Sequence, residues 1–266
     1  MTWRGTRALV GATHPGPALA VTVLAALLAL PAGLGPGTAA LVVAAVLTGQ
    51  LTIGWSNDLV DAGRDRAVGR TDKPLATGEL SERLVRGWCA AALVATLVLS
   101  LAVGLPAGPV HLLVVAGGWA YNLGLKATWL SWLPYAVAFG ALPAFVWLAG
   151  PLDPPLWGVA AGALLGVGAH LVNVLPDLAD DAATGVRGLP HRLGPRWLPV
   201  AAVVVLVAAS LVIALGAPGL PGWALGVGAA LVAGLALVAV VRPGRDAFRA
   251  AVGIALVDVL LLVVAG

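Results

Sequence analysis

Residues 54–79 read GWSNDLVDAGRDRAVGRTDKPLATGE. They follow directly on an apolar run that is long enough to cross a membrane. They hold five of the chain's twelve acidic residues. Asp58, Asp61 and Asp65 are spaced i, i+3 and i+7, so a helix that continues from the apolar run places these carboxylates on one face, with Asn57 beside them. Two unit charges about 4 Å apart repel by about 4 kcal/mol at an effective dielectric constant of about 20, which favours a bound counter-ion.

Mg²⁺ is the counter-ion that suits these side chains best. It prefers carboxylate and carbonyl oxygens, and it keeps water molecules that a phosphate can replace. Basic residues accompany the acids in the same segment, namely Arg64, Arg66, Arg70 and Lys73. The segment therefore favours a site for Mg²⁺ and a phosphate, with the solvated acidic end of a helix as the alternative interpretation.

The whole chain has the composition of a membrane protein. Of its 266 residues, 60% are hydrophobic and 10% are charged, and the mean hydropathy is +0.99. These values lie outside the range of soluble domains. With about 20 apolar residues for each crossing, the chain (residues 1–266) is predicted to be a single all-α domain, a multispanning bundle of about nine transmembrane helices. The predicted spans are 16–34, 38–57, 84–104, 107–123, 131–149, 156–175, 197–215, 222–241 and 248–265.

Two further features narrow the class of protein. Residues 1–21 have two arginines before an apolar stretch and so resemble a signal peptide, but no convincing cleavage site follows, which favours a retained first span. The single cysteine, Cys89, excludes an internal disulfide and a metal site made of several cysteines. The sequence pI of about 9.6 is attributed to basic loops beside a membrane, so no nucleic-acid partner is expected.

All fifteen Lys and Arg residues lie in segments that the predicted spans place on one side of the membrane. The positive-inside rule therefore predicts a multi-pass protein of the cell membrane, with the N-terminus and the acidic segments in the cytoplasm and the C-terminus outside. Two acids are not on the predicted cytoplasmic side, namely Asp153 in an outer loop and Asp258 in the last span. Because an acid inside the bilayer costs about 2.5 to 3.5 kcal/mol, Asp258 is expected to make a structural hydrogen bond or to lie at the rim of a cavity.

A second acidic segment ends the sixth predicted span, and residues 170–194 read HLVNVLPDLADDAATGVRGLPHRLG. Asn173, Asp177 and Asp181 are spaced i, i+4 and i+8, again one face of a helix, whose end Pro176 can kink. Two facing carboxylate arrays can hold several Mg²⁺ ions around one diphosphate and stabilise the charge on a departing pyrophosphate. The alternative interpretation is two unrelated loop ends.

These segments resemble the UbiA superfamily of intramembrane prenyltransferases, and the resemblance covers nearly the whole chain. The first family motif, NDxxDxxxD, is matched at every fixed position by NDLVDAGRD (57–65). The second, usually DxxxDxxxD, is similar to NVLPDLADD (173–181), with Asn173 in place of its first acid. The family's stretch after the first motif resembles RTDKPLATGELS (70–81), and its cytoplasmic Tyr and Lys motif resembles YNLGLK (121–126).

The resemblance implies a helical bundle around a central cavity that is capped on the cytoplasmic side and open laterally to lipid. It implies an enzyme of isoprenoid biosynthesis that binds an isoprenyl diphosphate through Mg²⁺, ionises it, and passes the allylic cation to a hydrophobic or aromatic acceptor. The metal shell, whose aspartates are also the catalytic residues, would consist of Asn57, Asp58, Asp61, Asp65, Asn173, Asp177 and Asp181. The diphosphate would be held by Arg70, Lys73, Tyr121 and Lys126.

Other functions and roles stay open. A membrane terpene cyclase would ionise the same diphosphate but quench the cation internally, and a polyprenyl phosphoribosyltransferase would need a sugar site that the sequence does not suggest. A divalent-cation transporter would place its acids near the middle of the bilayer instead of at one face. Arg187 and Arg192 are candidates either for the diphosphate or for the membrane surface. Trp55 is a candidate either for an interfacial anchor or for a cation–π contact with the carbocation.

Overall fold

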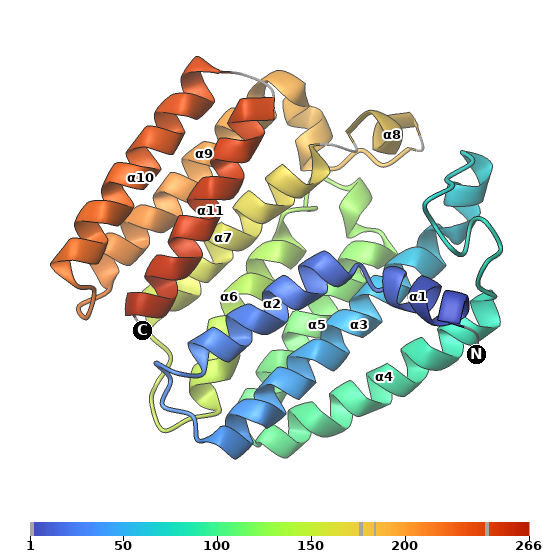
Figure 1. The fold of residues 1–266 in the computed structure, drawn as a ribbon, viewed down its shortest axis with the longest axis horizontal. Coiled ribbons are helices and arrows are strands. Elements are labelled where there is room, and N and C mark those ends of the chain that lie inside the picture. The colour runs from blue at the N-terminus through green and yellow to red at the C-terminus, as the bar shows by residue number, and fades with distance from the viewer. Residues whose placement is uncertain (1–2, 176–177, 184, 243–244, 266) are drawn as a thin grey trace.

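The computed structural model describes residues 3–175, 178–183, 185–242 and 245–265. These residues form helices and connecting turns, with no β-strand among them (Figure 1). The helices are α1 (Trp3–Gly11), α2 (Pro15–Leu28), α3 (Pro36–Ala67), α4 (Glu82–Val103), α5 (Ala107–Leu123), the 3₁₀ turn η1 (Leu125–Ala127), α6 (Leu133–Leu148), α7 (Leu156–Val174), α8 (Leu178–Ala183), α9 (Leu189–Gly216), α10 (Gly222–Val241) and α11 (Arg245–Ala265).

Within the described ranges, each predicted span overlaps one helix, from α2 for the first span to α11 for the last. Six helices are long and apolar enough to cross a membrane, namely α3, α4, α7, α9, α10 and α11. The pair α1 and α2 gives a seventh if a span bent by 66° is counted. α5 and α6 are shorter, with 17 and 16 residues. The all-helical, multi-pass architecture is therefore confirmed, whereas the count of nine crossings stays a prediction.

α3 is the longest helix and carries the first acidic segment. It begins with Pro36, whose missing N–H leaves no hydrogen bond unmade in a first turn, and its 32 residues extend over about 48 Å. The hydrocarbon core of a bilayer is only about 30 Å thick. The predicted span ended at residue 57, but α3 continues through Asp58, Asp61 and Asp65 to Ala67, as the helical spacing of these acids requires.

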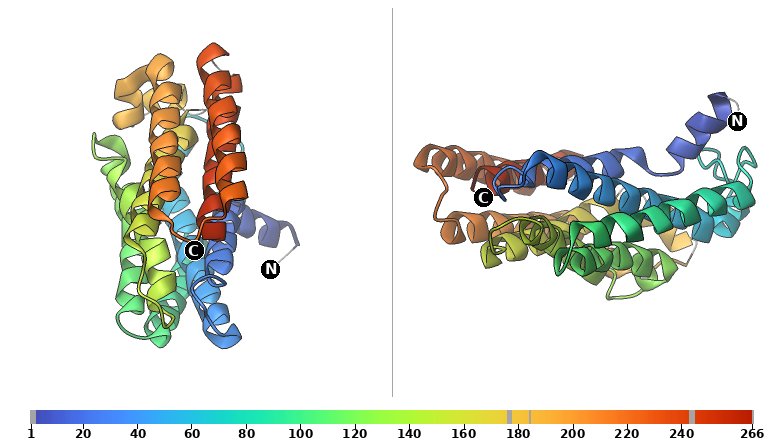
Figure 2. Two further views of the ribbon diagram at one scale, coloured as in Figure 1. Left: turned by 90° about the vertical axis from the view of Figure 1, so that its left-hand side faces the viewer. Right: turned by 90° about the horizontal axis from the view of Figure 1, so that it is seen from below.

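Six helices form a ring: α2 packs on α3, α3 on α5, α5 on α6, α6 on α7, α7 on α11, and α11 on α2. α4 lies outside this ring against α3 and α5, and α9 and α10 pack beside α11 (Figure 1). α1 projects from the bundle at an angle, as the right-hand view of Figure 2 shows. Because α3, α5 and α7 run in the same direction, their carboxyl-terminal ends lie at one end of the bundle, and the acidic segments lie there too.

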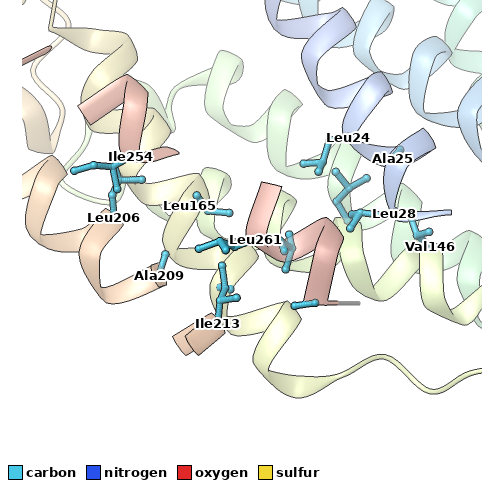
Figure 3. Packing of buried hydrophobic residues seen from close by; sticks show 14 of the residues in the cluster. Leu24, Ala25, Leu28, Val146, Leu165, Leu206, Ala209, Ile213, Ile254 and Leu261 are labelled. Carbon is cyan, nitrogen blue, oxygen red and sulfur yellow. The ribbon is translucent and has the colours of Figure 1, made fainter. Parts of the chain in front are cut away.

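The larger apolar core joins α7, α9 and α11, with α2 and α6 at its edge (Figure 3). Leu206 and Ile254 are fully buried there. A Cβ atom at Gly168 would lie 2.5 Å from Leu206 Cδ2, so the glycine allows α7 and α9 to approach closely. Asp258 is also buried in this region, and its Oδ1 accepts a hydrogen bond from Ser210 Oγ at 2.5 Å. This bond ties α11 to α9 and agrees with the structural role expected for Asp258.

The basic residues gather at one end of the bundle. They lie on α1, between the end of α3 and the start of α4, at Lys126, near the start of α9 and around the α10–α11 connection. Figure 1 shows these segments along its upper and right-hand edges. The turns along its lower and left-hand edges carry no Lys or Arg, and they are residues 29–35, 104–106, 149–155 and 217–221. The positive-inside rule predicts orientation from this kind of segregation.

Candidate active site

A cavity of about 460 Å³ lies inside the ring of helices and reaches the end that carries the acidic segments. Its apolar lining includes Val21, Val114 and Leu142. Most of the predicted site residues line it, namely Asn57, Asp61, Asp65, Arg70, Lys73, Tyr121, Lys126, Asn173 and Asp181. Of the other two, Asp58 does not line the cavity, and Asp177 lies outside the described residues. The cavity thus combines a charged end with an apolar interior.

Asp58 is held by two basic side chains instead of facing the cavity. Its Oδ1 accepts a hydrogen bond from Lys73 Nζ at 2.7 Å and lies 2.9 Å from His14 Nε2. The same His14 nitrogen lies 3.1 Å from Lys73 Nζ. Since Asp58 is only 2% exposed, these partners replace the water that the carboxylate has lost. His14 occupies the bend between α1 and α2, with a left-handed φ of 54°, so the three side chains fix this bend to α3.

Two residues beside Asp58 explain why the bend lies so close to α3. A Cβ atom at Gly54 would clash with the carbonyl oxygen of Thr13, so only glycine allows this approach. The next residue, Trp55, donates a hydrogen bond from its Nε1 to the carbonyl oxygen of Leu9 at 3.0 Å. Trp55 is buried and does not line the cavity. It therefore packs α1 against α3, and its alternative role as a contact for the carbocation is not supported.

Asp61 is paired with Lys126, which lies 65 residues later in the chain. Lys126 Nζ lies 2.5 Å from Asp61 Oδ1 and 2.7 Å from Oδ2, and an Arg64 guanidinium nitrogen lies 3.1 Å from Oδ2. The turn η1, directly after α5, brings Lys126 to this position. Asp65 is buried one turn further along α3 and lines the same cavity. Lysines from two distant segments thus neutralise the first two carboxylates of the acidic motif.

Asn57 is oriented by a hydrogen-bond network between α3 and α5. Its Nδ2 donates to Asn122 Oδ1 at 3.2 Å, while Asn122 Nδ2 donates to Ser56 Oγ at 2.8 Å and to the carbonyl oxygen of Ile53 at 2.9 Å. Asn122 is buried and immediately follows Tyr121. Because the nitrogen of the Asn57 amide is engaged, its oxygen is the end that can face a cation.

The second acidic segment is divided between two helices. Asn173 lies in α7, which ends at Val174, and Asp181 lies in α8, which begins at Leu178. The expected helical face through residues 173–181 crosses residues 176 and 177, which lie outside the described residues, so it stays a prediction. Both Asn173 and Asp181 nonetheless line the cavity. The Asn173 side chain is hydrogen-bonded to Tyr135, and Asp181 Oδ2 lies 3.9 Å from His191 Nε2.

Tyr121, Tyr135 and Phe139 form an aromatic wall along the α5 and α6 side of the cavity. The Tyr121 and Tyr135 rings meet edge to face with centroids 5.2 Å apart, and the Tyr135 and Phe139 rings stack at 6.3 Å. His170 packs behind both tyrosines and does not itself line the cavity. The electron-rich faces of such rings attract cations, so the wall suits a substrate that develops positive charge.

Arg70 reaches the cavity while it binds a neighbouring acid. Its Nε and a terminal nitrogen donate to the two carboxylate oxygens of Asp72 at 2.8 and 2.7 Å. These hydrogen bonds lower the pKa of Asp72 to about 2. Arg187 and Arg192 are exposed and do not line the cavity, which favours the membrane-surface alternative for both.

The residues present fit Mg²⁺ by the chemistry of their donors. In the part of the chain that the structure describes, no three His, Cys, Asp or Glu side chains are grouped closely enough to hold a metal ion. The cavity is lined instead by separate oxygen donors, the carboxylates of Asp61, Asp65 and Asp181 and the amides of Asn57 and Asn173. These are the hard ligands that Mg²⁺ prefers. Lys126 lies where a cation would lie beside Asp61.

Four of these side chains were not expected from the sequence, namely His14, Asp72, Asn122 and Tyr135. Asn122 lies inside the YNLGLK segment, so that motif held a signal for it. His14 precedes the Pro-Gly-Pro start of α2, but its pairing with Asp58 joins residues 44 apart in the sequence. Spacing alone therefore carries no signal for the His14 contact.

Residues 18–254 match the model of the UbiA prenyltransferase family. The bacteriochlorophyll synthase 33 kDa chain of Cereibacter sphaeroides is 33% identical over an alignment of 186 residues, which covers 63% of this chain and 59% of that protein. The match thus spans about three fifths of the length of this relative.

Solved structures share the fold over nearly the whole chain. A structure of digeranylgeranylglyceryl phosphate synthase has a TM-score of 0.76 at 17% identity and covers 98% of both chains. A UbiA homologue from Archaeoglobus fulgidus, bound to GPP and Mg²⁺, has a TM-score of 0.72 at 16% identity and covers 97% of this chain and 100% of its own. An apo UbiA homologue from Aeropyrum pernix has a TM-score of 0.73 at 20% identity, covering 94% and 98%. The family match and the shared fold show that this chain belongs to the UbiA prenyltransferase family.

Proposed function

We propose that this UbiA-type prenyltransferase transfers a prenyl group from an isoprenyl diphosphate to a hydrophobic or aromatic acceptor within the membrane, and that it requires Mg²⁺. The observation that carries the proposal is the two-part lining of the cavity. Oxygen donors from both acidic segments and basic side chains line one end, while the rest of the lining is mainly aromatic and apolar, with Gln50 among it. An isoprenyl diphosphate has the same two parts, an anionic head and an apolar tail.

The charged end supplies two sets of side chains. Mg²⁺, when bound, supplies positive charge to the diphosphate oxygens and to the departing pyrophosphate. The residues proposed to hold it are Asn57, Asp58, Asp61, Asp65, Asn173, Asp177 and Asp181. The residues proposed to hold the diphosphate directly are Arg70, Lys73, Tyr121 and Lys126.

The lysine contacts suggest how these two sets work together. Lys73 is bound to Asp58 and Lys126 to Asp61, so each lysine neutralises a carboxylate that is proposed to take a cation. With Mg²⁺ bound to these carboxylates, each lysine ammonium would be free to bind a diphosphate oxygen. Binding of the metal and of the diphosphate is therefore coupled through these two lysines.

The proposed reaction exchanges one bond for another. The C–O bond between the prenyl group and the diphosphate breaks, and its electron pair leaves with the pyrophosphate. The resulting allylic cation is captured by a carbon or heteroatom of the acceptor, which then loses a proton. The aromatic wall of Tyr121, Tyr135 and Phe139 lies along the same cavity, where it can stabilise the cation and keep water from capturing it.

The relatives support the substrate class. The A. fulgidus homologue was solved with GPP and Mg²⁺, and a second structure of an A. fulgidus homologue contains DMAPP and Mg²⁺. Bacteriochlorophyll synthase and digeranylgeranylglyceryl phosphate synthase are named for different products. The acceptor is accordingly assigned only to the hydrophobic or aromatic class.

The orientation in the membrane is part of the proposal. With the basic end of the bundle in the cytoplasm, the N-terminus and the active site face the cytoplasm, and nine crossings place the C-terminus outside. Reporter tags in the loops at 68–81 and 185–188 should report the cytoplasm, and a tag after Gly266 should report the opposite side. A C-terminal tag in the cytoplasm would contradict nine crossings.

The function is tested with purified protein in lipid or detergent, incubated with a panel of allylic diphosphates, with and without phenolic acceptors, and with products identified by mass. The expected result is a prenylated acceptor and free pyrophosphate. Excess chelator should abolish turnover and added Mg²⁺ should restore it. Full activity in chelator would contradict the metal requirement, and a cyclic hydrocarbon formed without any acceptor would instead support a terpene cyclase.

A further inference from the structure

We infer that Ser131 and His170 form a positioning pair that holds the segment of Lys126 against the start of α9 and thereby sets how tightly the cavity binds a diphosphate. The inference rests on the proposed function, because that function assigns Lys126 to the diphosphate. Both residues are fully buried, with 0% and 1% exposure, and neither lines the cavity. They act through the segments that they join.

The Ser131 hydroxyl connects three segments of the chain. Its Oγ lies 3.0 Å from His170 Nε2 on α7, and it accepts a hydrogen bond at 3.0 Å from the backbone N–H of Leu189, the first residue of α9. Ser131 itself follows Lys126 through consecutive turns, in which its N–H donates to the carbonyl oxygen of Thr128 at 3.1 Å. One buried hydroxyl thus fixes the segment before α6 to both α7 and α9.

Gly188 shows how closely the segments meet. A Cβ atom at this position would lie 2.5 Å from the carbonyl oxygen of Lys126 and 2.7 Å from Ser131 Oγ. The chain that enters α9 therefore lies directly against the backbone of Lys126, whose ammonium reaches Asp61. Without the Ser131 hydroxyl, the N–H of Leu189 is left without this partner, which is unfavourable for a partly buried donor. The Lys126 segment then loses its support on the α9 side.

His170 extends this support to the aromatic wall. Its ring lies 5.7 Å from the ring of Tyr121 and 4.9 Å from that of Tyr135. Tyr121 belongs to the last turn of α5, directly before Lys126, and Tyr135 is hydrogen-bonded to Asn173. The pair therefore contacts Tyr121, which precedes Lys126 in the chain, and Tyr135, which is bonded to Asn173 of the second acidic segment.

The chain contains a matched pair elsewhere that serves as a control. Ser100 Oγ lies 2.7 Å from His111 Nδ1, both residues are buried, and the His111 ring stacks on Phe145 at 4.6 Å. This pair joins α4 to the start of α5, at the opposite end of α5 from Lys126, and neither residue lines the cavity. It has the same chemistry and burial but does not contact the proposed diphosphate groups.

The experiment compares Ser131→Ala with Ser100→Ala in the full-length protein. Titration with inorganic pyrophosphate in the presence of Mg²⁺ gives a Kd that does not depend on turnover, and kinetics give KM and kcat for the isoprenyl diphosphate. Ser131→Ala should raise both the Kd and the KM about tenfold, as expected for the loss of one buried hydrogen-bond partner. It should change kcat less than it changes KM. Ser100→Ala should leave all three values within about twofold, as expected for a site with no shared partners.

A second variant guards against a general loss of folding. His170→Phe keeps a ring against Tyr121 and Tyr135 but removes the partner of Ser131, and it should raise Kd in the same direction. Equal effects of Ser131→Ala and Ser100→Ala on Kd, or no effect of Ser131→Ala and His170→Phe, would overturn the positioning role. A wild-type chain that binds no magnesium pyrophosphate contradicts the proposed function as well, whereas tight wild-type binding that Ser131→Ala does not weaken contradicts the positioning role alone.

Discussion

The two acidic segments of the cavity are built in different ways. The first lies on the unbroken helix α3, where Asp58, Asp61 and Asp65 are buried and the first two are paired with lysines. The second is divided between α7 and α8. Asn173 there is neutral and bonded to Tyr135. The comparison teaches that the first segment holds its acids on one helix with lysines bound to two of them, while the second supplies Asn173 and Asp181 from another side of the cavity.

This difference predicts unequal responses to mutation. Substitutions in the first segment disturb buried charges and their partners together, so their effects should be large. Substitution of Asn173 in the second segment changes a neutral side chain that is bonded to Tyr135, so its effect should be smaller. The following predictions test this order.

Asp61→Ala should have the largest effect. It removes a carboxylate at the centre of the first motif and leaves Lys126 and Arg64 without their shared partner. Loss of a transition-state contact of this kind lowers kcat about 10²- to 10³-fold. Steady-state kinetics measure the change, and Asp246→Ala, which removes a partly exposed acid at the start of α11, is the control with unchanged kcat. A harmless Asp61→Ala would contradict the assignment of the first motif.

Lys126→Gln should follow in size. It removes the charge that neutralises Asp61 and that is proposed to reach the diphosphate, and hydrogen bonds to charged groups contribute about 1.5 to 3 kcal/mol. The KM for the isoprenyl diphosphate should therefore rise about 10- to 100-fold. Lys73→Gln, at the partner of Asp58, should have a similar effect. The proposal that each lysine leaves its carboxylate to bind the diphosphate is wrong if both variants keep the wild-type KM.

Asn173→Asp should be mild or should tighten Mg²⁺ binding. It adds a negative charge on the cavity wall where a cation is expected, at the cost of the contact between Asn173 and Tyr135. The Mg²⁺ concentration for half-maximal activity should fall or stay within about twofold, since a single donor is exchanged at one wall. Loss of activity with intact folding and membrane insertion would show that the asparagine donates a hydrogen bond that an aspartate cannot replace.

Asp72→Asn should have the smallest effect. The pair with Arg70 is partly exposed, and exposed ion pairs contribute about 0 to 1 kcal/mol. The pKa of Asp72 is lowered to about 2, so the pair stabilises the protein above the unfolded value of about 4 and is lost only as the pH falls through this range. KM should therefore change less than about twofold in this variant, and the wild type should keep the pair between pH 8 and pH 5. A strong pH dependence of KM that Asp72→Asn removes would contradict this.

Much of the fold and the site could be predicted from the sequence because the signals were local. Helical spacing placed Asp58, Asp61 and Asp65 on one side of α3, and apolar runs located the long helices. The same reasoning stays a prediction for the second segment, because residues 176 and 177, between Asn173 and Asp181, lie outside the described residues. It could not predict the contact of His14 with Asp58, because that contact depends on a bend and a close approach at Gly54 that no periodic pattern encodes.

The length of α3 determines the depth of the site in the membrane. Asn57 lies 21 residues after the start of the helix at Pro36, or about 32 Å along its axis, which is close to the thickness of the hydrocarbon layer. The proposed orientation would therefore place the carboxylates near the level of the lipid phosphates. The proposed substrate, an isoprenyl diphosphate dissolved in the bilayer, would carry its own charged group at this level and would enter by lateral diffusion without leaving the membrane. Its effective concentration is then a surface density, and apparent KM values should scale with the amount of lipid in the assay.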